Sequence, residues 1–364
     1  MKLYFLLLLL LLYVQPEHAQ EDSRPENIIL LIGDGMGINY VAASVLSMEN
    51  DPFRKFDITG FSITSSADKL ITDSAAGATA IATGYRTNNY FIGVDTLYQP
   101  LYSFFSLAES LNKSTGLVAT STITHATPAS FVANVNNRAD ELEIARQMIY
   151  KDLEVVIGGG KKFFLPLKDN GSREDDQNLI DSLKNSGYNF INSFPELVSD
   201  TSDDKFFAIL SLEGLPKASE RDYSLGTLTS IALKKLSSDP DGFVLMVEGS
   251  QIDWAGHYHE TDYLLNELSD FNTAINTALD FAIEDKNTLV IVTADHETGG
   301  MAITAGEKDG SELEIKYLTG GHTAGLVGVF AYGPGAEKFS GVYDNYILGR
   351  KIFYLLKPDF LFSD

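Results

Sequence analysis

Several short stretches of the sequence place acidic residues and histidines among glycines. The clearest is VEGSQIDWAGHYHE, in which Asp253 and His257 stand four residues apart. On a helix, side chains at that spacing share one face, so a carboxylate and an imidazole could grip one cation there. The alternative is an ion pair on a helix surface. Three further stretches, IGDGMG, TADHETGG and TGGHTAG, add Asp34, Asp295, His296 and His322.

These side chains form a mixed set of nitrogen and oxygen ligands, numerous enough for two mixed sites and one oxygen-rich site. Imidazole with carboxylate suits Zn²⁺, whereas an oxygen-only set suits Mg²⁺. Two metal ions about 4 Å apart support in-line displacement at phosphorus, because one stabilises the attacking oxygen and the other the leaving oxygen. Arg138, in NVNNRAD, has the planar fork that suits bidentate phosphate binding, although most arginines are only surface charges.

The stretch TDSAAGATAIATG, residues 72–84, offers a nucleophile for this chemistry. Ser74 could attack phosphorus if direct metal coordination ionised its hydroxyl. It could also be only the N-cap of the helix that follows, because serine is among the residues preferred at that position.

The elements that must position these residues are predicted by apolar runs. The runs are continuous rather than alternating, as in strands that are covered on both faces. Amphipathic stretches lie between them; the clearest is a helix over 262–284, with Thr261 as its cap. Strand and helix alternation predicts a mainly parallel sheet between two helical layers. The seven runs span residues 27–35, 114–120, 153–160, 205–211, 242–250, 288–296 and 325–333.

Polar side chains stand at the carboxyl ends of several of these runs, namely Asp34, Glu248, Asp295 and His296. Ligands of open α/β sheets bind beyond the carboxyl ends of the strands, so segments far apart in sequence should converge on one rim. We expect residues 161–204 to be a surface excursion and residues 304–319 to be a small hairpin or loop insertion.

The composition and the net charge limit the functions and partners that this protein can have. The chain has 364 residues, 44% of them hydrophobic, and a net charge of −23. That charge argues against nucleic acid and anionic membranes as partners, and it means that any anion site needs concentrated local positive charge. There is no cysteine, so no disulfide can form.

Residues 1–20 read as a secretory signal peptide, because the apolar core of 3–14 is too short to span a bilayer comfortably; an uncleaved anchor is the alternative. Residues 21–364 are expected to be a single catalytic domain in the periplasm or outside the cell, without a membrane span.

Six stretches taken together resemble the alkaline phosphatases, and they occur in that family's order between residues 33 and 325. They are IGDGMG, TDSAAGATAIATG, THATPAS, VEGSQIDWAGH, TADHETGG and TGGHTAG. The resemblance implies a three-layer α/β/α fold and hydrolysis of phosphate monoesters through a phosphoserine. Ser74 would be the nucleophile as well as the helix cap, and Arg138 the phosphate-binding arginine.

The resemblance also implies two zinc ions and one magnesium ion. By motif, one zinc would be held by Asp253, His257 and His322. The second would be held by Asp34, Asp295 and His296, with Ser74. Magnesium would be held by Asp34, Thr127 and Glu248.

Two positions depart from the best-known bacterial pattern. His125 stands where those enzymes have aspartate, and Trp254, the only tryptophan, stands where they have lysine. Both are expected beside the substrate and the magnesium site, although plain packing is the alternative for Trp254. The exchange removes an anion beside magnesium and a cation near phosphate, so metal affinity and rate are expected to differ from those of these enzymes.

Two other functions are alternatives to the hydrolysis of phosphate monoesters. Relatives that hydrolyse phosphodiesters, phosphonates or sulfate esters share the metal ligands but usually carry another nucleophile. A non-catalytic phosphate- or metal-binding protein would lack the nucleophile or a ligand, and none is missing here. The sequence fixes neither the physiological substrate nor the oligomeric state, and it is compatible with a homodimer.

Overall fold

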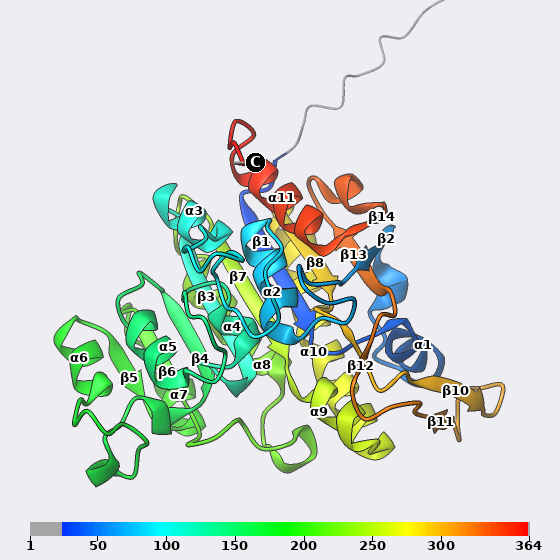
Figure 1. Ribbon diagram of the computed structural model, residues 1–364, viewed down its shortest axis with the longest axis horizontal. Coiled ribbons are helices and arrows are strands. Elements are labelled where there is room, and N and C mark those ends of the chain that lie inside the picture. Colours follow the sequence, from blue (N-terminus) through cyan, green and yellow to red (C-terminus); the bar gives the residue numbers. More distant parts are fainter. Residues whose placement is uncertain (1–23, 363–364) are drawn as a thin grey trace, which may run out of the picture.

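A ten-stranded sheet runs through the middle of the computed structural model, which describes residues 24–362 (Figure 1). Its spatial order is β14–β2–β13–β8–β1–β7–β3–β4–β6–β5. All seven apolar runs are strands of this sheet, as predicted. The strands are β1 (Asn27–Gly33), β2 (Ile58–Ile63), β3 (Ser114–Thr122), β4 (Val155–Gly159), β5 (Asn189–Ile191), β6 (Phe206–Ile209), β7 (Phe243–Gly249), β8 (Thr288–Thr293), β13 (Val327–Tyr332) and β14 (Gly341–Asp344).

The sheet is mainly parallel, as expected. Only β13 runs against its two neighbours, β2 and β8. The central strands end in register, because Ile32 of β1 pairs with Glu248 of β7 on one side and with Thr293 of β8 on the other. The polar residues that end or follow these strands are therefore brought to the same edge of the sheet.

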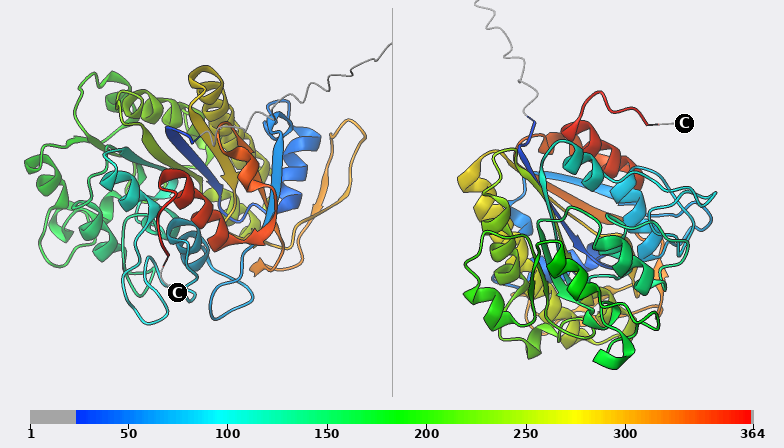
Figure 2. Two further views of the ribbon diagram at one scale, coloured as in Figure 1. Left: turned by 90° about the horizontal axis from the view of Figure 1, so that it is seen from above. Right: turned by 90° about the vertical axis from the view of Figure 1, so that its left-hand side faces the viewer.

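Helices cover both faces of the sheet and complete the predicted three-layer α/β/α fold (Figure 2). The apolar faces of α1, α8, α9 and α10 pack on one side, and those of α2, α3, α5, α6 and α11 on the other. The helices are α1 (Ile38–Ser47), α2 (Ser74–Thr83), α3 (Phe104–Ser110), α4 (Ala126–Ala129), α5 (Glu141–Met148), α6 (Leu179–Asn185), α7 (Phe194–Ser199), α8 (Leu225–Leu236), α9 (Gln251–Tyr258), α10 (Thr261–Asp285) and α11 (Asn345–Leu356).

Two pairs of short strands lie outside the main sheet. The antiparallel pair β10 (Ala302–Ala305) and β11 (Glu314–Lys316) is the hairpin predicted within 304–319, and it projects at the right-hand edge of Figure 1. The pair β9 (Glu297–Thr298) and β12 (His322–Thr323) holds the segment after β8 against the glycine-flanked histidine.

Two local predictions were wrong. Thr261 is the first residue of α10 rather than its cap; the cap position belongs to Glu260, whose side chain makes no capping hydrogen bond. Residues 161–204 are more than a surface excursion, because β5 extends the sheet beside β6. The strand is only three residues long, so its polar surroundings hide it in the sequence.

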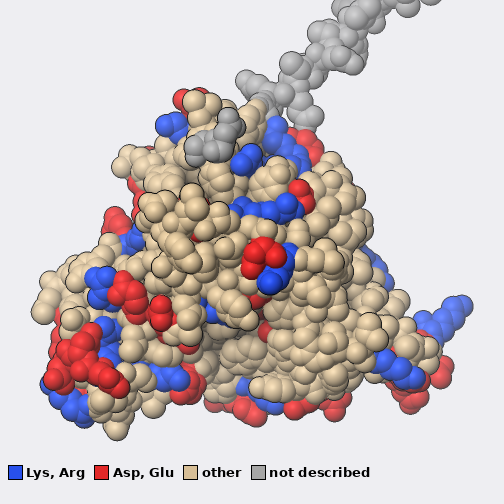
Figure 3. Space-filling view, in the orientation of Figure 1, with Lys and Arg blue, Asp and Glu red and all other residues tan. Residues whose placement is uncertain are grey.

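Within residues 24–362 no helix is both long and apolar enough to cross a membrane. The predicted signal peptide lies outside the described residues. Acidic side chains gather at the lower left of the molecule, around α6, and along its lower edge, whereas the centre of this face carries few charges (Figure 3).

Candidate metal centre and active site

Three buried carboxylates stand at the ends of the central strands. Asp34 follows β1, Glu248 is near the end of β7, and Asp295 follows β8. All three are fully buried. Gly35, with φ +69°, makes the turn after β1, and its backbone N–H donates to Asp295 Oδ1 at 3.1 Å. A Cβ at Gly35 would lie 2.8 Å from Asp253 Oδ1, so this turn has no room for a side chain.

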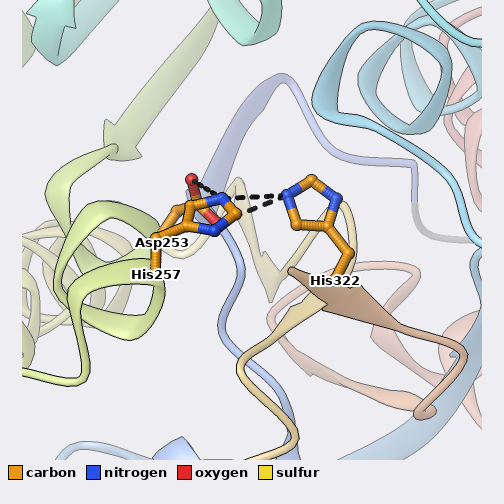
Figure 4. A group of neighbouring side chains, drawn as sticks. All are labelled: Asp253, His257 and His322. Carbon is orange, nitrogen blue, oxygen red and sulfur yellow. Dashed lines mark hydrogen bonds and ion pairs between the residues drawn. The ribbon is translucent and has the colours of Figure 1, made fainter. Parts of the chain in front are cut away.

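The first cluster joins Asp253, His257 and His322 (Figure 4). Asp253 and His257 lie on one face of α9, as their spacing predicts, and His322 approaches from β12. His257 Nε2 lies 3.2 Å from Asp253 Oδ2, and the two Nε2 atoms of the histidines are 3.2 Å apart.

The second cluster joins Asp34, Asp295 and His296. His296 Nε2 lies 3.4 Å from Asp34 Oδ1 and 3.3 Å from Asp295 Oδ2. The same nitrogen is 3.2 Å from Ser74 Oγ. The candidate nucleophile therefore faces this cluster directly.

A third cluster joins Asp34, Glu248 and His125. Thr127 is fully buried on α4 and lies beside Glu248. Its Oγ1 makes no hydrogen bond within the described residues. The three residues expected to hold magnesium thus lie together, with His125 next to them.

Ser74 is the first residue of α2 and does not cap it, which corrects the expected double role. The cap is Asp73, whose Oδ1 accepts from the N–H of Ala76 at 3.0 Å. Because the neighbouring carboxylate caps the helix, the serine hydroxyl is left to face His296 and the arginine.

Arg138 also reaches Ser74, the candidate nucleophile. Its Nη1 lies 3.1 Å from Asp73 Oδ2 and 3.4 Å from Ser74 Oγ, and its Nη2 lies 3.1 Å from His125 Nε2. Trp254 packs edge-on against His125, with the ring centroids 6.3 Å apart. The structure therefore brings all twelve predicted site residues to one rim.

The carboxylates of this rim repel one another in a buried setting. Burial raises the pKa of Glu248 and of Asp295 to about 7. Burial and the nearby charge of Asp295 also raise the pKa of Asp34. Burial alone would raise the pKa of Asp253 too, but the hydrogen bond from His257 holds it below its ordinary value. The same hydrogen bond raises the pKa of His257 to about 8.

The other histidines favour their neutral forms. Burial and the neighbouring His322 lower the pKa of His296, and burial lowers that of His322 itself. Burial and the Arg138 guanidinium lower the pKa of His125 to about 3. Neutral imidazole is the form that binds a metal ion.

A surrounding layer of contacts orients these ligands, and the sequence analysis missed it. The Nδ1 atoms of His257 and His322 lie 2.7 Å and 2.9 Å from the backbone carbonyls of Gly320 and Thr72, which fixes those nitrogens as donors. The Thr298 hydroxyl donates to Asp253 Oδ1. Such contacts fix the tautomer and the orientation of metal ligands. Any residue can supply a backbone carbonyl, so the sequence gives no sign of these carbonyl partners. Thr298 could have been found, because it stands two residues after His296 in the stretch TADHETGG.

The comparisons with known proteins agree with this geometry. A family model described as alkaline phosphatase matches residues 25–316. The chain belongs to the alkaline phosphatase family. Alkaline phosphatase 4 of Bacillus subtilis is 34% identical, over 93% of this chain and 90% of its own length. Alkaline phosphatase 3 of the same organism is 32% identical, over 96% and 94%.

Solved structures show the same alkaline phosphatase fold. The enzyme from the Antarctic bacterium TAB5 is 40% identical and superposes with a TM-score of 0.84, covering 92% of this chain and 98% of that one. A variant of the TAB5 enzyme in which a histidine is replaced by aspartate has Mg bound in its M3 site. The resemblance drawn from the six motifs is thus confirmed, and the chain is an enzyme of the alkaline phosphatase kind.

Proposed function

We propose that this enzyme hydrolyses phosphate monoesters to an alcohol and inorganic phosphate through a covalent phosphoserine on Ser74. The position of the Ser74 hydroxyl carries the proposal. Its Oγ lies 3.2 Å from His296 Nε2 and 3.4 Å from Arg138 Nη1, between a cluster of metal-binding side chains and a guanidinium fork. A nucleophile and a phosphate clamp are the two groups that phosphoryl transfer needs besides metal ions.

The residues present fit two zinc ions and one magnesium ion. His257 and His322 each donate through Nδ1, so in their neutral forms the Nε2 lone pairs face each other at 3.2 Å, where one metal ion would bind both. Several buried polar atoms of the site also have no hydrogen-bond partner within the described residues; they are both carboxylate oxygens of Asp34, Oδ2 of Asp295, Oε1 of Glu248, Oγ1 of Thr127 and Nδ1 of His125. Unsatisfied buried carboxylate oxygens are costly unless cations compensate them.

The assignment of ligands follows the clusters. Asp253, His257 and His322 would hold one zinc. Asp34, Asp295 and His296 would hold the other, with Ser74. Asp34, Thr127 and Glu248 would hold magnesium, a set of oxygen ligands that suits a hard cation.

The chain's own groups then account for binding and orientation. Arg138 would bind two phosphoryl oxygens through its planar fork. The first N–H groups of α2 would add favourable potential for the dianion, because Ser74 opens that helix. When bound, the zinc ions would supply the positive charge that ionises the serine hydroxyl and stabilises the leaving oxygen.

Two displacements at phosphorus complete the reaction. Ser74 Oγ forms a bond to phosphorus while the bond from phosphorus to the ester oxygen breaks, and the alcohol leaves with a proton. A water molecule then attacks the phosphoserine, which releases inorganic phosphate and restores the hydroxyl. Export completes the proposal: removal of residues 1–20 would leave one catalytic domain, residues 21–364, in the periplasm or outside the cell.

Replacing the nucleophile tests the proposed function. Ser74→Ala should lower kcat for a phosphate monoester by several orders of magnitude, with unchanged thermal unfolding. Ser66→Ala is the matched control, since the hydroxyl of Ser66 bonds Asp68 and Lys69 in a loop. Acid quenching during turnover should trap phosphate on Ser74 in the unmodified enzyme. Near-normal turnover by Ser74→Ala, or a preference for diesters or sulfate esters over monoesters, would refute the proposal.

A further inference from the structure

A cavity of about 500 Å³ opens beside the site, and the proposed chemistry does not use it. Its lining surface is more apolar than polar. Leu215 and Pro216 contribute aliphatic groups, and Trp254, Tyr258 and Tyr263 form an aromatic wall. The cavity is large enough for an organic group of moderate size, because ligand sites range from about 300 to 1,000 Å³.

Helix α9 links this cavity to the first metal-binding cluster. Asp253 and His257 form one stripe of the helix and belong to that cluster. Trp254 and Tyr258 each follow one residue later, so they form the adjacent stripe, turned by about 100°. That second stripe lines the cavity. The first metal-binding cluster and the aromatic wall of the cavity therefore lie on adjacent faces of the same helix, α9.

The cavity adjoins the first cluster through Trp254, which follows Asp253 in the chain and lines the cavity. Ser74 faces the second cluster through His296, so in-line attack places the leaving oxygen toward the first cluster, that of Asp253 and His257. A second contact relates the cavity to the phosphate position, because His125 lines the cavity and also lies 3.1 Å from Arg138 Nη2. A single side chain, that of His125, thus connects the phosphate position with the lining of the cavity.

The charges that line the cavity disfavour an anion. Three glutamates line it, Glu141, Glu213 and Glu220, against one cation, Lys217. That lysine is already engaged, with its Nζ 3.9 Å from the centre of the Tyr263 ring. A negatively charged alcohol would therefore meet repulsion, whereas an uncharged ring would meet aromatic side chains.

We propose that this cavity binds the alcohol part of the substrate and selects uncharged aromatic groups over anionic ones. The proposal rests on the proposed function, because it concerns the leaving group of the same reaction. Trp254 and Tyr258 act here as residues that determine specificity.

Two pairs of esters test the selection. 2-Phenylethyl phosphate and ethyl phosphate release alcohols of similar basicity, so their intrinsic reactivity is matched. The ratio of their kcat/KM values should be roughly 10 to 100, which corresponds to burial of one aromatic ring. The ratio for 3-phosphooxypropanoate, whose leaving group carries a carboxylate, against ethyl phosphate should be below one.

Variants should change these ratios in opposite directions. Trp254→Ala and Tyr258→Ala should bring the aromatic ratio toward one, whereas Tyr150→Ala should leave it unchanged, because that exposed tyrosine does not line the cavity. Glu220→Lys should raise the ratio for the carboxylated ester severalfold. Aromatic and anionic ratios that are unaffected by these substitutions would overturn the proposal.

Binding gives a readout that is independent of turnover. Trp254 is the only tryptophan of the chain, so tryptophan fluorescence reports on the cavity and the adjoining phosphate position, and ethylphosphonate serves as the control for the phosphonate group. In the metal-loaded enzyme, 2-phenylethylphosphonate should change that emission and bind roughly tenfold or more tightly than ethylphosphonate. Equal affinities with no change in emission would refute the cavity assignment while Ser74-dependent hydrolysis stands. Loss of Ser74-dependent hydrolysis of every monoester would instead refute the proposed function.

Discussion

Asp73 makes three contacts, and a comparison of two substitutions at this residue separates their contributions. Its Oδ1 caps α2 by accepting from Ala76, its carboxylate accepts from the N–H of Tyr90 at 3.1 Å, and its Oδ2 lies 3.1 Å from Arg138 Nη1. We expect Asp73→Ala to lose all three contacts. Asp73→Asn keeps an oxygen that can cap the helix but loses the charge that holds the arginine.

The magnitudes follow from these contacts. Loss of an N-cap costs about 1 kcal/mol. A backbone N–H left without its partner costs a further 1 kcal/mol or so, and a partly exposed ion pair contributes at most about 1 kcal/mol. The free energy of unfolding should therefore fall by roughly 2–3 kcal/mol in Asp73→Ala and by at most about 1 kcal/mol in Asp73→Asn. Ser224→Ala removes an ordinary cap, that of α8, and calibrates the first of these costs.

Urea unfolding and phosphate inhibition together separate stability from orientation. Both Asp73 variants should raise the inhibition constant of inorganic phosphate severalfold, because the Arg138 fork loses its anchor. In an Arg138→Ala background, Asp73→Asn should have no further effect on that constant. An unchanged inhibition constant in Asp73→Asn would show that the ion pair does not position Arg138. Equal destabilisation by the two substitutions would show that the side-chain oxygen does not cap α2.

Three further perturbations test the charges of the molecule. Chelation should abolish activity and lower the temperature of thermal unfolding, and Zn²⁺ with Mg²⁺ should restore both; full activity without detectable metal would refute the metal assignment. His125→Asp should lower the Mg²⁺ concentration for half-activation roughly 10- to 100-fold in zinc-reconstituted enzyme, because a carboxylate holds a hard cation or its waters better than imidazole does; an unchanged value would remove His125 from that site. Burial raises the pKa of Glu267 from 4.5 to about 7, so its contribution to stability is present below about pH 4.5 and is lost as the pH rises through 7. The unfolding free energy of the unmodified enzyme minus that of Glu267→Gln should therefore fall by roughly 3 kcal/mol between pH 4 and pH 8, and a difference independent of pH would refute the shift.

The central part of the fold could be predicted because its strands are buried on both faces. Continuous apolar runs such as those of β1 and β8 leave no other interpretation once helices alternate with them. Two strands at or near the ends of the sheet were missed for the converse reason. β2, between β14 and β13, is only half-buried, and the edge strand β5 has three residues, so neither has an apolar run long enough to stand out.

The candidate ligands could also be predicted. Some of them, such as Asp34 and Asp295, stand at ends of parallel strands, which the sheet brings together, whereas Asp253 and His257 share one face of a helix. The helix cap could not be decided, because aspartate and serine are equally good caps and stand side by side at 73 and 74. The cavity was out of reach for a different reason. Its wall joins Leu215 to Trp254 and Tyr263, and only packing between a loop and two helices creates that space.

The charge of the site sets an order of events. The phosphate position is surrounded by four buried carboxylates, those of Asp34, Glu248, Asp253 and Asp295, and Arg138 brings one positive charge to Ser74. A phosphate dianion would be repelled by such a set, and the whole chain, with a net charge of −23, repels it as well. Affinity for substrate can therefore arise only after cations have compensated the carboxylates. Under the proposed mechanism, metal binding would control both the affinity for phosphate and the ionisation of Ser74, and the carboxylates and histidines that repel a phosphate dianion are the same groups that would hold the metal ions.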